Sequence, residues 1–150
     1  MPNTYTQLYI QLVFAVKGRE CQVTEGVRER LQQYLCGIAS QRQHKPLAIY
    51  CMPDHLHLLV GLNPDQSIAD LVRDLKSISS TWLNTERLLP DKFQWQTGYG
   101  AFSYARSQLD AVVNYILTQP EHHHKTAFQE EYKQFLVKFG IEYDERYLFE

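Results

Sequence analysis

LAIYCMPDHLHLLVGL, residues 47–62, contains two short apolar runs separated by a turn. Each run has the length and the apolar content of a short strand. Between them lie Pro53 and Asp54, which favour a tight turn because proline fixes φ and aspartate bonds to nearby backbone. We therefore expect a β-hairpin whose strands lie near residues 47–51 and 56–62.

The sequence before the hairpin predicts a long strand followed by a helix. Residues 5–17 are mostly apolar at every second position, which is the period of a half-buried strand. Thr24 suits the N-cap of a helix, and apolar residues then recur at helical spacing as far as Ile38. A strand and an amphipathic helix thus lead into the hairpin.

The sequence after the hairpin predicts a second helix and a fourth strand. Ser67 is followed three residues later by Asp70, which resembles a capping box at the start of an amphipathic helix. Residues 92–105 are rich in aromatic residues and glycine, which indicates a strand that bends at its glycines.

Two further helices complete the chain. We expect one from Ser107, with Asp110 in its capping box, to Pro120, and one from Thr126 with Gly140 at its C-terminal cap. The order strand, helix, strand, strand, helix, strand, helix predicts an α+β fold, a ferredoxin-like sandwich. In it, helices pack mainly on one face of an antiparallel sheet of about four strands. At 150 residues, we expect one domain spanning residues 1–150.

The composition is that of a globular protein, with 44% hydrophobic and 21% charged residues, and it excludes a wholly disordered chain. The formal net charge of -2 does not attract a polyanion, so nucleic-acid binding would have to come from a local basic patch. Pairs of basic residues are also common on ordinary solvated surface. The candidate DNA-binding pairs are Lys17 with Arg19, Arg42 with Lys45, and Arg73 with Lys76.

The three cysteines indicate a reducing compartment. Cys21, Cys36 and Cys51 are odd in number and form no C-x-x-C pair, so neither a disulfide framework nor a zinc knuckle is indicated. The apolar run over residues 8–16 is interrupted by Gln11 and is far shorter than a membrane span. We expect a cytoplasmic protein without a signal peptide or membrane anchor.

Two histidines alternate with leucine at the start of the second hairpin strand. On a strand, His55 and His57 project from one face while Leu56 enters the core, and we expect the imidazoles to face outward together. Residues two apart lie roughly 7 Å apart along a strand, so both rings can reach to about 2.1 Å from one ion. Such a pair also arises by chance, and a real site needs a third protein ligand.

A tyrosine and a glutamine on the third helix are candidates to complete this site. Tyr115 and Gln119 lie at i and i+4, so both emerge on one helix face that could meet the histidines. A tyrosine hydroxyl becomes a workable nucleophile near a base or a metal-polarised phosphate, and the glutamine could supply a neutral oxygen ligand. Because the chain has ten tyrosines, simple packing is the competing interpretation of Tyr115.

Residues 52–60 resemble the histidine motif of the HUH single-tyrosine transposases of bacterial insertion sequences, the insertion-sequence-200-like family. Residues 95–103, residues 115–119 and the stretch from 122 to 147 are similar to the same family in order and spacing. The resemblance covers nearly the whole chain.

The resemblance implies that His55 and His57 bind a divalent ion, that Gln119 contributes to its binding, and that Tyr115 is the nucleophile. It also implies a homodimer whose tyrosine helix is able to complete the partner's site, and recognition of hairpins in single-stranded DNA near the ends of an element. An ion with imidazole and phosphate oxygen ligands would be Mg²⁺ or Mn²⁺. The implied activity is cleavage and rejoining of single-stranded DNA through a 5′-phosphotyrosine.

Two other functions remain open at this point. One is a non-catalytic module that binds RNA or single-stranded nucleic acid on the same fold, since fold does not determine function. The other is a metal-dependent hydrolase in which bound water attacks and Tyr115 is structural.

Overall fold

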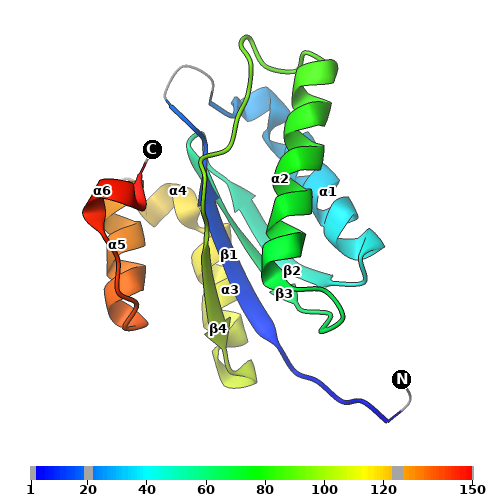
Figure 1. Cartoon of the computed structure of the whole chain (residues 1–150), viewed down its shortest axis with the longest axis vertical. Coiled ribbons are helices and arrows are strands. Elements are labelled where there is room, and N and C mark those ends of the chain that lie inside the picture. The colour runs from blue at the N-terminus through cyan, green and yellow to red at the C-terminus, as the bar shows by residue number, and fades with distance from the viewer. Residues whose placement is uncertain (1–2, 19–21, 123–126, 150) are drawn as a thin grey trace.

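The computed structural model describes residues 3–18, 22–122 and 127–149. Four strands form one antiparallel sheet in the order β2-β3-β1-β4 (Figure 1). This arrangement, with helices on the sheet, confirms the α+β class. The strands are β1 (Tyr9–Ala15), β2 (Lys45–Cys51), β3 (His55–Gly61) and β4 (Gly100–Tyr104).

The predicted hairpin is confirmed as β2 and β3. The Met52 N–H donates to the His55 carbonyl at 2.8 Å, which closes the turn around Pro53. The Asp54 carbonyl accepts from the Val16 N–H, also at 2.8 Å, so the turn is fixed to the end of β1. β1 is shorter than the expected 5–17, because its first residues extend beyond the sheet and are exposed.

Two helices cover one face of the sheet, α1 (Glu25–Gln41) and α2 (Ile68–Thr85). Ser67 caps α2 by accepting the Asp70 N–H at 3.0 Å, as its sequence predicts. Burial of apolar side chains between these helices and the sheet supplies most of the driving force for folding, at about 25 cal/mol per Å². Fully buried members of this core include Leu12, Leu31, Leu35, Leu56, Leu58, Leu71 and Leu75.

Three more helices cover the opposite face: α3 (Leu109–Leu117), α4 (Gln119–His122) and α5 (Phe128–Lys138). The expectation that helices lie mainly on one face was therefore wrong in this detail. The physical reason lies in β1, where every residue from 10 to 16 is buried, so both faces of the strand need cover. The alternation in β1 reflects two different cores rather than a core and a solvent face.

The C-terminal half differs from the expected elements at several boundaries. β4 has only five residues, and the stretch before it runs irregularly with Phe93 fully buried in the first core. A 3₁₀ turn, η1 (Arg106–Gln108), precedes α3, and Pro120 lies inside α4 rather than ending a helix. Proline is tolerated there because first-turn N–H groups have no intrahelical acceptor.

The C-terminal cap of α5 is as expected, but the expected N-terminal caps are not seen, because α3 and α5 begin after Gln108 and Ala127 with no side-chain cap bond. Gly140 has a φ of +67° just after α5, which is the left-handed conformation of a C-terminal cap. The expected cap residue at the start of α5, Thr126, lies outside the described residues. A further short helix, α6 (Glu145–Leu148), was not expected.

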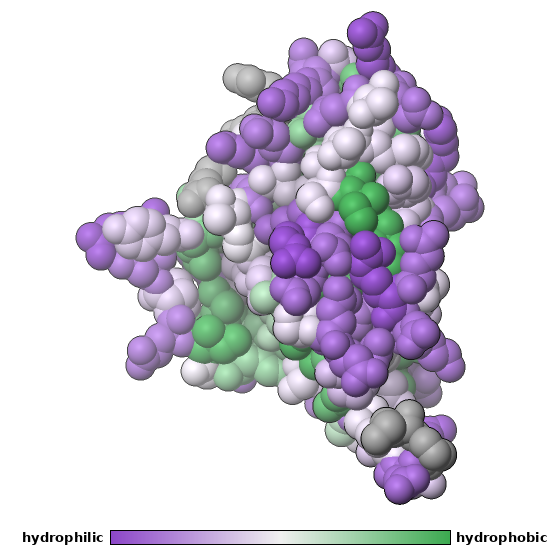
Figure 2. All heavy atoms as spheres, turned by 45° about the vertical axis from the view of Figure 1, so that its right-hand side comes forward, coloured by the Kyte–Doolittle hydropathy of each residue, from purple (hydrophilic) through white to green (hydrophobic). Residues whose placement is uncertain are grey.

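The side of the molecule toward α1 and α2 is largely hydrophilic (Figure 2). None of the described helices is both long enough and apolar enough to cross a membrane.

Candidate active site

β3 carries the two histidines on the face that α3, α4 and α5 cover. The strand register places His57 opposite Val13 and His55 opposite Ala15, so both imidazoles point into this second layer. Their exposed fractions are 0% for His57 and 1% for His55. The two rings do share one strand face, but the expectation that they face outward was wrong because helices bury that face.

Each imidazole is held by a side-chain oxygen at its Nδ1 atom. His55 Nδ1 lies 2.7 Å from an Asp54 carboxylate oxygen, and His57 Nδ1 lies 2.6 Å from the Gln11 amide oxygen. Because these oxygens accept, Nδ1 carries the proton and the lone pair resides on Nε2. Gln11 is itself fixed, since its Nε2 donates to the Tyr104 hydroxyl at 2.7 Å.

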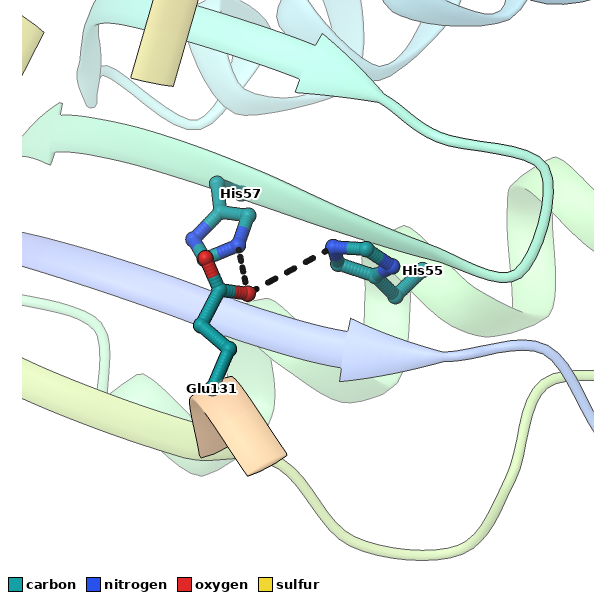
Figure 3. Close-up of side chains that lie close together, drawn as sticks. All are labelled: His55, His57 and Glu131. Atoms are coloured by element: carbon teal, nitrogen blue, oxygen red, sulfur yellow. Dashed lines mark hydrogen bonds and ion pairs between the residues drawn. The ribbon is translucent and has the colours of Figure 1, made fainter. Parts of the chain in front are cut away.

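Glu131 of α5 brings a buried carboxylate to the two Nε2 atoms. One carboxylate oxygen, Oε1, lies 3.1 Å from His57 Nε2 and 3.7 Å from His55 Nε2 (Figure 3). The Glu131 residue is 4% exposed. Because both Nε2 atoms present lone pairs to Oε1 in this tautomer, a cation between the three groups would suit the buried negative charge.

The three side chains fit a divalent ion. Their candidate ligand atoms all lie within 4.8 Å of one another. Two atoms that each lie about 2.1 Å from one ion are separated by roughly 3.0 to 3.5 Å at octahedral to tetrahedral angles. The observed separations of 3.1 and 3.7 Å are close to this range. Two imidazoles and a carboxylate also leave coordination positions for a phosphate oxygen.

Gln119 lies beside these groups, at the start of α4 rather than on α3. Its amide oxygen is 3.5 Å from His55 Nε2, and its amide nitrogen donates to Glu131 Oε2 at 3.4 Å. The same nitrogen donates to the Tyr115 carbonyl at 3.3 Å, so the i, i+4 proximity persists although α3 ends at Leu117.

The Tyr115 hydroxyl donates a hydrogen bond to Oε2 of Glu131. The Tyr115 ring stacks on His122 with ring centroids 4.4 Å apart and lies 6.0 Å from the His57 ring. Burial first, and then the hydrogen bond to Glu131 and its charge, raise the pKa of Tyr115 well above its ordinary value. The hydroxyl is therefore protonated at neutral pH and needs a proton acceptor before it can attack.

Of the basic residues predicted to bind DNA, those whose side-chain partners the structure describes contact groups outside this centre. Arg42 and Arg73 both pair with Asp74, and Lys76 donates to the carbonyls of Gln96 and Gly98. DNA binding by these residues stays a prediction. Of the others, Lys17 and Lys45 are exposed and Arg19 lies outside the described residues.

Sequence reasoning missed Glu131, Gln11 and Asp54. Glu131 lies between Phe128 and Phe135 at helical spacing, and a charge within an apolar helix stripe was the signal that could have found it. Gln11 gave a similar signal, because it interrupts an otherwise apolar strand. Both polar groups lie on buried faces and contact His57.

Comparison with known proteins matches this chain to one family. The family model described as "Transposase IS200 like" matches residues 4–119. The ISDra2 transposase TnpA of Deinococcus radiodurans is 36% identical over 74 residues, which are 49% of this chain and 53% of that protein. The aligned region thus spans about half the length of that relative.

Two solved structures share the fold. One, from Deinococcus radiodurans R1 and described as a candidate transposase, has a TM-score of 0.62 and 26% identity, covering 78% of this chain and 94% of its own. The other, a REP-associated tyrosine transposase bound to a REP hairpin, has a TM-score of 0.62 and 16% identity, covering 81% and 72%. Since the family model runs from the segment before β1 through Gln119, the chain belongs to the IS200-like transposase family.

Proposed function

We propose that this chain is a DNA transposase that cleaves and rejoins single-stranded DNA, with Tyr115 as the nucleophile. The observation that carries the proposal is the convergence of Tyr115, Gln119 and the histidine pair on the buried Glu131 carboxylate. Family membership supports the same reaction class.

In the proposed reaction, the Tyr115 oxygen attacks phosphorus in line with the bond to the 3′ oxygen. The P–O3′ bond breaks, and the departing 3′ oxygen takes a proton from water to become a 3′-hydroxyl. Glu131 Oε2 already accepts the hydrogen bond of the Tyr115 hydroxyl, so it is placed to take the proton of the nucleophile. The 5′-phosphotyrosine keeps the energy of the broken bond, and a second 3′-hydroxyl can reverse the attack and join two strands.

The proposed cofactor is Mg²⁺ or Mn²⁺, held by His55, His57 and Gln119, with Glu131 added to the ligand set because its Oε1 faces both imidazoles. When bound, the ion withdraws charge from a phosphate oxygen and orients the scissile bond. Asp54 and Gln11 keep each imidazole in the tautomer that presents Nε2.

The proposed substrate is single-stranded DNA with hairpins near the ends of an insertion sequence. The hairpin bound by the structurally similar REP-associated transposase supports this class of ligand. We also propose a homodimer in the cytoplasm. The contacts of Tyr115 with Glu131 and of Glu131 with His57 support a site that is complete within one chain.

The test is a covalent adduct assay. End-labelled single-stranded hairpin DNA from the regions flanking the gene, incubated with Mn²⁺, is expected to give a protein–DNA adduct on denaturing gels. Tyr115→Phe should abolish the adduct, whereas Tyr147→Phe, at an exposed tyrosine, should retain it. An adduct that persists in Tyr115→Phe would sink the assignment of the nucleophile.

The same assay separates the competing functions. A hydrolase would release a shortened strand with no adduct, and a binding module would retain the DNA uncut. His57→Ala is expected to lose cleavage while hairpin binding, measured by fluorescence anisotropy, stays within a few-fold of the parent. Equal cleavage by this variant and the parent would refute the metal role of His57.

A further inference from the structure

A cavity of about 530 Å³ opens beside Tyr115 and Glu131, and neither His55 nor His57 lines it. Its walls come from η1 and α3 on one side and α5 on the other, and residues of β1 and β4 complete it. α3 and α5 lie on the same side of the sheet (Figure 1). Small-molecule sites commonly measure roughly 300 to 1,000 Å³, so the cavity has room for a ligand of nucleotide size.

The lining combines flat rings with side-chain amides. Tyr104 and Phe135 are half-buried aromatic residues of the wall, and Gln108 and Gln134 are exposed glutamines there. Aromatic rings stack on nucleobases, and glutamine side chains can pair with base edges. The exposed Lys138 contributes a cation, which suits a phosphate of the same ligand.

The position of the cavity favours part of a strand over a free small molecule. Tyr115 and Glu131 belong both to the candidate active site and to the cavity lining. A strand whose phosphate lies at the Tyr115 hydroxyl must therefore place an adjoining nucleotide near this opening. A base can enter such a cavity only when it is unpaired and unstacked, which agrees with a single-stranded substrate.

We propose that this cavity binds one unpaired nucleotide adjoining the scissile phosphate. The base lies against Tyr104 and Phe135, and the Gln134 amide and the amide nitrogen of Gln108 contact its edge, since the Gln108 oxygen accepts the Ala105 N–H. The proposal rests on the proposed function in one respect, that single-stranded DNA reaches Tyr115. It adds a site for base selection next to the reacting atoms.

Photocrosslinking tests the proposal without cleavage. Hairpin oligonucleotides carry 5-iodouracil at one position after another of their single-stranded flanks, and the full chain binds them without added divalent ion. After irradiation, peptides are mapped by mass spectrometry. We expect one position, or two neighbouring positions, to crosslink to Tyr104 or Phe135. Crosslinks at other residues only, or none, would overturn the proposal.

A matched pair of variants strengthens the test. Ala111 is exposed on α3 and lines the cavity, so Ala111→Trp should fill it and lower the crosslink yield at least tenfold. Leu117 is exposed on the same helix but does not line the cavity, so Leu117→Trp should keep the yield. Equal melting temperatures of the two variants verify that both are folded. An unchanged yield in Ala111→Trp contradicts the proposal.

The two proposals can fail separately. If the parent forms the Tyr115 adduct but no crosslink maps to the cavity, the nucleotide site is wrong and the nucleophile stands. If crosslinks map to the cavity but Tyr115→Phe still forms the adduct, the nucleotide site stands and the proposed nucleophile is wrong.

Discussion

One carboxylate connects the candidate ligands to the candidate nucleophile. Glu131 Oε1 faces the Nε2 atoms of both histidines, while Oε2 accepts hydrogen bonds from Tyr115 and Gln119. The two oxygens can therefore serve two purposes at once, one as a ligand and one as a proton acceptor. A glutamine at this position would keep the shape but lose the charge.

Glu131→Gln is accordingly expected to weaken Mn²⁺ binding by roughly 10- to 100-fold, the size of effect seen when groups around a metal site are removed. Isothermal titration calorimetry measures the affinity directly. Glu130→Gln is the matched control, because Glu130 is the exposed neighbour on the same helix. Unchanged or tighter Mn²⁺ binding by Glu131→Gln would mean that the Glu131 carboxylate is not a ligand and only competes with the ion for the two histidine nitrogens.

Tyr104 gives a prediction about alkaline pH. Burial raises the pKa of Tyr104 to about 12, and the Gln11 hydrogen bond opposes part of this rise. The unfolded chain loses the tyrosine proton near pH 10 whereas the folded chain keeps it, so this contribution to stability is complete below about pH 10 and declines above it. Tyr104→Phe should therefore lose less unfolding free energy than the parent between about pH 9 and pH 11.

Urea unfolding at the two pH values measures this difference, with Tyr5→Phe as the control at a tyrosine that is 90% exposed. If the parent and Tyr104→Phe lost equal amounts of unfolding free energy, burial of Tyr104 would not be the cause of the pH dependence.

At the scale of single residues, sequence reasoning found the histidines, Tyr115 and Gln119 but not their surroundings. The spacing of His55 and His57 on a strand is local, so it could be read directly. Glu131 is 74 positions from His57 in sequence, and its role depends on how α5 packs on the sheet. No local pattern encodes that packing.

At the scale of elements, the hairpin, α1 and α2 followed from periodicity and caps because both are local signals. The helices on the second face of the sheet could not be predicted from periodicity. A strand that is buried on both faces and a strand that is buried on one face can show the same alternation of residues. β4 was expected to be longer because Phe93 and Trp95 resemble strand residues. Both aromatic residues instead pack into the first core from the segment before β4, where Trp95 forms only an isolated antiparallel bridge with Val16.

The start of β4 depends on a glycine. A Cβ at Gly100 would lie 2.9 Å from ring atoms of both Phe102 and Tyr132, closer than side chains tolerate. Gly100→Ala should therefore destabilise the fold by about 1–3 kcal/mol, the cost of overpacking a core. Chemical denaturation measures the free energy of unfolding.

Gly37→Ala is the matched control for this substitution. Gly37 lies inside α1, and a Cβ added there would meet no neighbouring atom within 4 Å, so alanine should stabilise the helix by about 0.5–1 kcal/mol. If Gly100→Ala and Gly37→Ala shift the free energy of unfolding in the same direction, the close approach of β4 to α5 does not determine the effect of the substitution at Gly100.

At the scale of the whole molecule, the candidate site draws on segments that are distant in sequence but belong to one chain. β3 supplies the histidines, α3 supplies Tyr115 and α5 supplies Glu131. A dimer that exchanged its tyrosine helices would instead join Tyr115 of one chain to the histidines of the other. Mixed variants distinguish these two arrangements.

When Tyr115→Phe and His57→Ala proteins are mixed, a site built within one chain leaves every site defective, so we expect no adduct above the level of either variant alone. A site shared between chains would regain one intact combination in mixed dimers, and adduct formation would return. The control dilutes the parent with Tyr115→Phe, where the adduct should fall only in proportion to the parent. Recovery in the mixture would contradict the contacts that place Tyr115 on the Glu131 of its own chain, beside its own His57.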